Sequence, residues 1–214
     1  MKLTSQSFRH GGAIPGHCAF AVMDPKTHVR LSDNRNPELS WTDAPAGTRS
    51  FVLLCIDSDC PTVGDNVNKE GRSVAKSLPR AEFMHWAMVD IPAAVSAIAE
   101  GACSQGVTPH GKQEPKGPAG SRQGMNDYTG WFAGDKNMAG TYLGYDGPCP
   151  PWNDELAHHY RFELHALDLE RCPVKGWFTV DDVRKAIDGH SLAKAAISGI
   201  YTLNPALNPA VQLP

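Results

Sequence analysis

The feature that most constrains the fold is an apolar run that ends in two closely spaced aspartates. Residues 49–57 contain this continuous run, which is typical of a β-strand buried on both faces. Asp57 and Asp59 follow, and Pro61 comes next. Both aspartates have the parity of Phe51, so a regular strand would place the two carboxylates on one face. Two like charges at the end of a buried strand indicate either a polar site or a pair of turn-forming residues.

Two further segments have strand patterns. Residues 83–91, "FMHWAMVDI", form a second apolar run, whereas residues 159–168, "HYRFELHALD", alternate between apolar and polar. The alternation predicts a sheet with one solvated face. Its apolar face contains Tyr160, Phe162, Leu164 and Ala166, and its polar face contains His159, Arg161, Glu163 and His165.

Composition favours a β-rich, single-domain protein. The chain of 214 residues contains 20 Gly and 17 Pro, which indicates short elements joined by frequent turns. A hydrophobic content of 41% and a charged content of 20% fit a globular protein. We found no internal repeat and no linker, so residues 1–214 are predicted to form one domain. Its long loops are expected at 62–82 and 106–128, with an irregular tail from residue 204.

Helix signals lie in the C-terminal part. Thr179 and Asp182 resemble a capping box, and Gly189 can end the helix that follows. The apolar residues at helical spacing behind this cap are Val180, Val183 and Ile187. Ser191 is predicted to cap a second helix, which contains Leu192, Ala195, Ala196 and Ile200.

Charge and cysteine content exclude several classes of protein. A formal net charge of -3 gives no argument for binding nucleic acid or an anionic membrane. No apolar run reaches the length of a transmembrane segment, and residues 1–10 lack the apolar core of a secretory signal. The six cysteines show no CxxC spacing, so we expect reduced thiols in a cytoplasmic protein without a cofactor. The sequence does not determine the oligomeric state, and a homodimer is one of the alternatives.

Two strand histidines are candidates for a site. His158 has the parity of Tyr160 and stands at the entry of the third strand. A regular strand would also place His85 on an apolar face, together with Phe83, Ala87 and Val89. A histidine in such a position is often a hydrogen-bonded core residue rather than a ligand-binding group.

Three strands therefore place polar groups on inward faces near their ends. If those ends meet, the groups form a small polar pocket in an apolar wall, which is a common form of ligand site. The groups are Asp57, Asp59, His85, His158 and Tyr160.

Two enzymatic interpretations compete with a binding site. Residues 189–193, "GHSLA", come close to a nucleophile elbow around Ser191, but that elbow needs a strand before it and a helix after it. Here a predicted helix precedes the motif. A divalent metal is the other interpretation, because carboxylate and imidazole groups are possible ligands. Its ligands would be Asp57, Asp59, His85 and His158.

The ordered motifs resemble those of the phosphatidylethanolamine-binding protein (PEBP) family, in its bacterial Raf-kinase-inhibitor-like branch. The motifs are "DSDCP", "HWAMVDIP", "YDGPCPP", "HHYRFELHALDL" and "HSLAKAAI", and the resemblance covers nearly the whole chain. It implies a mainly β fold, a Greek-key antiparallel β-sandwich with a few peripheral, mostly C-terminal helices. It also implies a pocket for phosphate groups and phosphorylated headgroups.

The resemblance assigns the pocket residue by residue. The family's D-x-D-x-P motif falls on Asp57, Asp59 and Pro61, and its H-W motif falls on His85 and Trp86. The Gly-Pro loop falls on Gly147, Pro148, Pro150 and Pro151, and the H-x-Y motif falls on His158 and Tyr160. Ser58 and Cys60 depart from the Pro and Ala usual in the first motif. The stretch from Pro61 to His85 is also longer than in compact members.

The function that the resemblance implies is non-enzymatic binding of a small anionic or phosphorylated ligand. In this hypothesis the His85 imidazole and the Tyr160 hydroxyl donate hydrogen bonds to phosphate oxygens. Modulation of a protein kinase or protease partner is part of it. The alternative is a metal-dependent or acid–base hydrolase or lyase that uses Asp57, Asp59 and His85.

Overall fold

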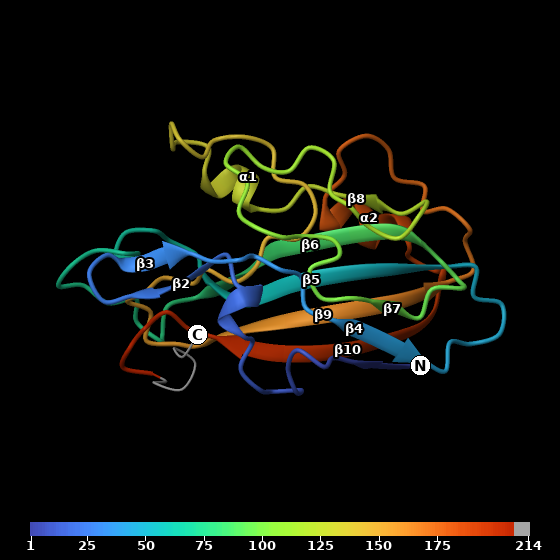
Figure 1. The fold of residues 1–214 in the computed structure, drawn as a ribbon, viewed down its shortest axis with the longest axis horizontal. Coiled ribbons are helices and arrows are strands. Elements are labelled where there is room, and N and C mark those ends of the chain that lie inside the picture. Colours follow the sequence, from blue (N-terminus) through green and yellow to red (C-terminus); the bar gives the residue numbers. More distant parts are fainter. Residues whose placement is uncertain (208–214) are drawn as a thin grey trace.

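The structure is a computed structural model that describes residues 1–207 (Figure 1). Strands dominate this part of the chain, and both α-helices are short. The elements are β1 (Lys2–Thr4), the 3-10 helix η1 (Gly16–Cys18), β2 (Ala21–Asp24), β3 (His28–Leu31), β4 (Leu39–Thr42), β5 (Ser50–Pro61), β6 (Arg80–Pro92), β7 (Ala97–Ile98), β8 (Arg122–Gln123), α1 (Tyr128–Trp131), β9 (His158–Leu167), α2 (Val180–Ala186) and β10 (Ser191–Tyr201).

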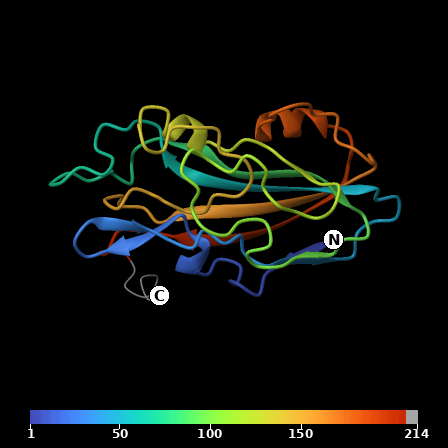
Figure 2. The same ribbon diagram turned by 45° about the horizontal axis from the view of Figure 1, so that its top comes forward.

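A five-stranded antiparallel sheet forms the centre of the molecule, in the order β10-β9-β5-β6-β8. A three-stranded sheet, β1-β4-β7, and the β2-β3 hairpin complete the fold. Figure 2 shows α2 on one side of the central sheet and the β1–β4 layer on the other. The mainly β, antiparallel fold expected from the sequence is confirmed.

Both faces of the central sheet are covered by apolar side chains. On one face, Trp41 of β4 packs against Phe51 of β5, with ring centroids 5.5 Å apart. On the other face, Val180 and Val183 of α2 pack in the cluster that contains Val52. Residues of β5 therefore alternate between two cores, which explains why its sequence is a continuous apolar run.

The three predicted central strands are present. They are β5, β6 and β9, and the alternation of β9 places its apolar side chains in the main core. Its other face is less solvated than the pattern predicts, because Glu163 is buried at 2% exposure. An ion pair with Lys194 of β10 (2.9 Å) compensates this buried carboxylate.

Of the two predicted C-terminal helices, only the first is present. Thr179 caps α2 by accepting a hydrogen bond from the Asp182 backbone N–H, and the Asp182 carboxylate accepts one from the Thr179 backbone. The predicted helix from Ser191 to Ile200 is wrong, since this segment is β10 and pairs with β9 along its length.

The second helix was mispredicted because alanine and glycine carry little periodic signal. Side chains at odd positions of β10 face inward, ending in buried Ile197, Gly199 and Tyr201. Gly199 is needed there because a Cβ would lie 2.5 Å from a side-chain carbon of Ile14. A glycine at an inward position interrupts the apolar alternation by which a strand is recognised.

An N-terminal segment covers one edge of β10. Backbone hydrogen bonds join residues 11–14 to β10, from the Gly11 N–H to the Ser198 oxygen and from the Ile14 N–H to the Ile200 oxygen. Chain ends far apart in sequence therefore lie side by side.

The predicted loop at 62–82 runs to Pro79, and Arg80 begins β6. The predicted loop at 106–128 contains the two-residue strand β8 and reaches the first residue of α1. Residues 208–214 of the predicted tail lie outside the described residues. Within residues 1–207, no helix has the length and apolarity needed to cross a membrane.

Replacing Thr179 with Ala should destabilise the protein by about 1 kcal/mol, because the α2 cap is lost. Urea denaturation measures the change in the free energy of unfolding. Thr108→Ala is the matched control, since Thr108 is exposed, and it should change stability by less than about 0.5 kcal/mol. Equal effects of the two substitutions would contradict the capping role.

Candidate functional site

The ends of β5, β6 and β9 meet at a small cavity of about 40 Å³. Since one water needs roughly 10–15 Å³ of such space, the cavity holds about three water-sized groups. That is the size of the oxygens of one phosphate or carboxylate group. The predicted convergence of Asp57, His85, His158 and Tyr160 is therefore present in the structure.

Not all of the predicted site residues reach the cavity. Those that line it are Asp57, Pro61, His85, Pro150, Pro151, His158 and Tyr160. Those that lie elsewhere are Asp59, Trp86, Gly147 and Pro148. The lining residues that sequence reasoning missed are Cys60, Asn68, Phe83, Tyr128, Trp131 and Cys149.

A β-bulge turns Asp59 away from the cavity. Between the pairs Asp57↔Phe83 and Cys60↔Ala81, β5 contains one residue more than β6. The extra residue reverses the parity of the strand, so the expectation that both carboxylates share a face is wrong. The Asp59 carboxylate instead accepts hydrogen bonds from the His159 backbone (2.8 Å) and ring (2.9 Å).

A second bulge turns His85 toward the cavity. Cys55 pairs with Trp86 and Ile56 pairs with Met84, so His85 has no partner on β5. His85 therefore lies on the same side as Trp86, although the two are neighbours in sequence. The prediction that His85 shares a face with Phe83, Ala87 and Val89 is correct only in part. Ala87 and Val89 belong to the opposite core, under α2.

Trp86, Gly147 and Pro148 do not line the cavity but pack around the segments that form it. The Trp86 ring N–H donates to the Gln123 side-chain oxygen (2.6 Å). Gly147 approaches the Cys18 carbonyl so closely that a Cβ would lie 2.2 Å from that oxygen. The Pro148 carbonyl accepts a hydrogen bond from the Phe20 backbone N–H (2.9 Å). These contacts fix the position of the Gly-Pro loop.

His158 lies between two carboxylates in the wall of the cavity. Its Nδ1 donates to Asp57 (2.7 Å) and its Nε2 donates to Asp154 (3.2 Å). Burial disfavours the charged ring, but hydrogen bonds to Asp154 and Asp57 outweigh it and raise the pKa of His158 to about 9. Arg80 completes the cluster through two hydrogen bonds to Asp154 (2.6 and 3.0 Å).

His85 is held as a neutral ring. Its Nδ1 lies 2.7 Å from the Asp146 carbonyl oxygen, an acceptor, so Nδ1 carries the proton. Burial lowers the pKa of His85, although Asp57 opposes this effect. The sequence hypothesis that this neutral ring donates to an anion needs correction, because Nε2 then presents a lone pair and donates only after gaining a second proton.

Asp146 organises the loop behind His85, and sequence reasoning missed it. Its buried carboxylate accepts hydrogen bonds from Asn34 (2.7 Å), Lys112 (2.6 Å) and Asn126 (2.9 Å). The only sequence signal was its place directly before Gly147. Its partners come from distant parts of the chain, so no local pattern indicates them.

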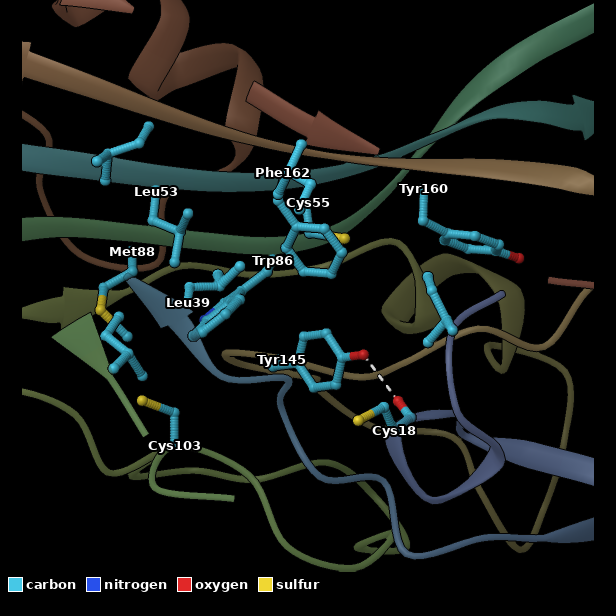
Figure 3. Packing of buried hydrophobic residues seen from close by; sticks show 14 of the residues in the cluster. Cys18, Leu39, Leu53, Cys55, Trp86, Met88, Cys103, Tyr145, Tyr160 and Phe162 are labelled. Atoms are coloured by element: carbon cyan, nitrogen blue, oxygen red, sulfur yellow. Dashed lines mark hydrogen bonds between the residues drawn. The ribbon is translucent and has the colours of Figure 1, made fainter. Parts of the chain in front are cut away.

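The Tyr160 hydroxyl is the unusual polar group of the cavity. Tyr160 is 0% exposed, and its hydroxyl makes no hydrogen bond of ordinary length and angle within the part of the chain that the structure describes. Burial, the charge of Asp57 and a weak hydrogen bond to its carboxylate raise the pKa of Tyr160 well above its ordinary value, so the hydroxyl keeps its proton. Figure 3 shows this hydroxyl pointing away from the Trp86 cluster. A buried, unpaired donor indicates a ligand position.

Neither enzymatic interpretation is supported by geometry. In the described part of the chain, Asp57, Asp59, His85 and His158 do not bring three ligand atoms within 4.8 Å of one another. Ser191 begins a strand and follows a helix, the reverse of a nucleophile elbow.

Comparison with known proteins identifies the family. The family model described as "Phosphatidylethanolamine-binding protein" matches residues 4–202. The UPF0098 protein YbhB of Escherichia coli is 31% identical over 202 residues, which cover 94% of this chain and 100% of that protein. A UPF0098 protein of Aquifex aeolicus is 29% identical, covering 94% of this chain and 88% of its own.

Solved structures agree. The crystal structure of E. coli YbcL, described as a new member of the mammalian PEBP family, has a TM-score of 0.67 and 26% identity. The match covers 94% of this chain and 97% of YbcL. A putative PEBP homologue of Chlamydia trachomatis, CT736, has a TM-score of 0.62 at 26% identity, over 94% of this chain and 95% of its own. The chain therefore belongs to the phosphatidylethanolamine-binding protein family, in the branch of these bacterial UPF0098 proteins.

Proposed function

We propose that this protein binds a small anion, such as the phosphate group of a phosphorylated ligand, in the cavity at the ends of β5, β6 and β9. The observation that carries the proposal is the buried Tyr160 hydroxyl, which lies near Asp57 but makes no well-formed hydrogen bond. Leaving such a donor unpaired costs about 1–3 kcal/mol, and an anion oxygen would remove that cost.

The charges around the cavity permit an anion. Asp57 alone would repel one, but its negative charge faces the protonated ring of His158 (2.7 Å). The second carboxylate, Asp154, is paired with Arg80 (2.6 Å). The four groups together carry no net charge, so hydrogen-bond donors decide which ligand is bound.

A proton must accompany the anion. The His85 Nε2 is an acceptor while Nδ1 donates to Asp146. A phosphate that still carries a hydroxyl can donate to this nitrogen. A fully ionised anion can be bound only if His85 gains a proton.

The rest of the ligand lies outside the cavity. The cavity, of about 40 Å³, is small and opens to solvent, so a ligand larger than its anionic group would extend from the mouth. Asn68 and Trp131 line the cavity and are exposed, with Trp131 at 51%, so they mark its mouth. A zwitterionic headgroup would place its ammonium group near this mouth.

Binding without catalysis is the better-supported reading. The alternative hydrolase or lyase needs Asp57, Asp59 and His85 together, and Asp59 contacts His159 instead. Modulation of a kinase or protease partner in the cytoplasm remains part of the proposal. Ligand bound beside Trp131 would change the surface that such a partner contacts.

Tyr160→Phe should weaken binding of O-phosphorylethanolamine or inorganic phosphate roughly ten- to hundredfold, by loss of one hydrogen bond to a charged group. Calorimetric titration measures the affinity. The stability of the ligand-free protein should change little, because the lost hydroxyl makes no well-formed hydrogen bond. His85→Ala should weaken binding by a similar factor.

Tyr201→Phe is the matched control, since this buried hydroxyl donates to the Ala21 carbonyl (2.9 Å), and Tyr201 does not line the cavity. It should lower stability and leave affinity unchanged. Wild-type affinity in both Tyr160→Phe and His85→Ala would overturn the site.

Phosphate affinity should fall as pH rises from 6 to 8, by up to about tenfold per pH unit. The reason is linkage: binding requires one proton, and a phosphate monoester such as O-phosphorylethanolamine loses its own above a pKa of about 6. Titrations at several pH values test this. The proton can come from the phosphate or be gained by His85, and sulfate distinguishes the two because it carries no proton in this range. Sulfate binding that depends on pH would assign the proton to His85. Phosphate affinity independent of pH would contradict the proton requirement.

Stability should also depend on the charge of His158. A pKa raised from 6.5 to about 9 by folding stabilises the native state fully below pH 6.5, and this contribution is lost as pH rises to 9. At about 1.4 kcal/mol per pH unit, the loss is about 3 kcal/mol. Urea denaturation across this range should show it in wild type but not in His158→Gln.

His190→Gln is the control for that experiment, because His190 is an exposed ring paired with Asp168 (3.0 Å). It should keep the wild-type pH profile. Parallel profiles for wild type and His158→Gln would contradict the charged state of His158.

A further inference from the structure

A second group of chemically active side chains lies apart from the anion cavity. His17 and Cys18 belong to η1, and Glu100 follows β7. The His17 Nε2 is 3.2 Å from one Glu100 oxygen, and the Cys18 Sγ is 4.0 Å from the other. One ligand atom from each of the three residues lies within 4.8 Å of the other two.

We propose that His17, Cys18 and Glu100 form a binding site for a divalent transition metal, with Zn²⁺ as the best match. Imidazole nitrogen, thiolate sulfur and carboxylate oxygen are the three ligand types of protein zinc sites. Bond lengths of about 2.0–2.3 Å separate tetrahedral ligands by roughly 3.3–3.8 Å. The 3.2 and 4.0 Å contacts run to different Glu100 oxygens, and the three ligand atoms lie within 4.8 Å of one another, so they need to approach by at most about 1 Å to reach that range.

The backbone already holds two of the ligands in place. The Cys18 backbone N–H donates to the Pro15 carbonyl (2.9 Å), and the His17 carbonyl accepts from the Arg35 N–H (3.0 Å). The Tyr145 hydroxyl donates to the Cys18 carbonyl (2.7 Å), as the dashed line in Figure 3 shows. Little ordering is therefore needed when a metal binds.

Glu100 is held by a neighbouring hydroxyl. The Ser7 Oγ donates to one Glu100 oxygen (2.7 Å). A water can occupy the fourth position around the metal. His17 and Glu100 are partly exposed, with side chains at 43% and 31%, so an ion can reach them from solvent.

The charges balance once the thiol loses its proton. Zn²⁺ with one thiolate and one carboxylate is neutral. The positive charge of nearby Arg35 would repel the metal ion, but Arg35 pairs with Asp33 (3.5 Å). Without metal, a buried thiol keeps its proton at neutral pH. The metal must displace that proton.

An ordinary ion pair between His17 and Glu100 is the competing explanation. It accounts for two of the three groups but not for the third. Cys18 is a buried residue of the main core, and its sulfur also lies 4.0 Å from a Glu100 oxygen. The metal site accounts for all three.

Equilibrium dialysis of the full chain against Zn²⁺ tests the proposal, with Co²⁺ absorption as the probe for thiolate ligation. One Zn²⁺ per chain is expected, together with a Co²⁺–thiolate band. Binding should become up to about tenfold tighter per pH unit between pH 6 and 8, because one proton is released. His17→Asn and Glu100→Gln should each weaken binding at least about tenfold. Both change partly exposed side chains, so the fold should survive.

Cys18→Ser should abolish the Co²⁺–thiolate band. Cys103→Ser is its matched control, since Cys103 is another buried core cysteine, and it should keep both the band and the affinity. Absence of Zn²⁺ binding in wild type would overturn the site. So would Zn²⁺ affinity unchanged in both His17→Asn and Glu100→Gln, or a thiolate band that persists in Cys18→Ser.

Discussion

The buried ring of His158 between two carboxylates is the interaction on which the site depends. This ring joins Asp57 of β5 to Asp154, which lies in the loop before β9. Arg80 at the start of β6 binds the same Asp154 carboxylate. Removing any one member would leave a buried charge without its counterpart, which is costly. The ends of three strands are thus fixed by one cluster. The position of Tyr160 and the shape of the cavity follow from it.

The cavity is built from irregularities in otherwise regular strands. One bulge leaves His85 without a partner on β5 and turns it inward, and another turns Asp59 outward. A regular β5-β6 pair would have separated His85 from Trp86 and brought two carboxylates into one small space. The bulges therefore select which polar groups enter the cavity, as is common beside functional sites.

The sequence was sufficient for the central strands, the cap of α2 and, together with the family resemblance, about half of the cavity residues. Periodicity identifies a strand, but a bulge reverses which face the following side chains occupy. This explains the wrong face predicted for Asp59 and the wrong neighbours, Ala87 and Val89, predicted for His85. β10 was mistaken for a helix because Ala and Gly fit both periods. Asp146 and Asp154 act through partners distant in sequence, so only the fold reveals them.

The edge of the central sheet at β10 bears on how the chain behaves at high concentration. An open edge strand is a template on which another chain can add a strand. Here residues 11–14 already occupy the backbone groups around Ser198 and Ile200. The other half of the edge is interrupted by a bulge after Ser191. Addition of a strand from another chain is therefore blocked where residues 11–14 lie and is disfavoured at the bulge.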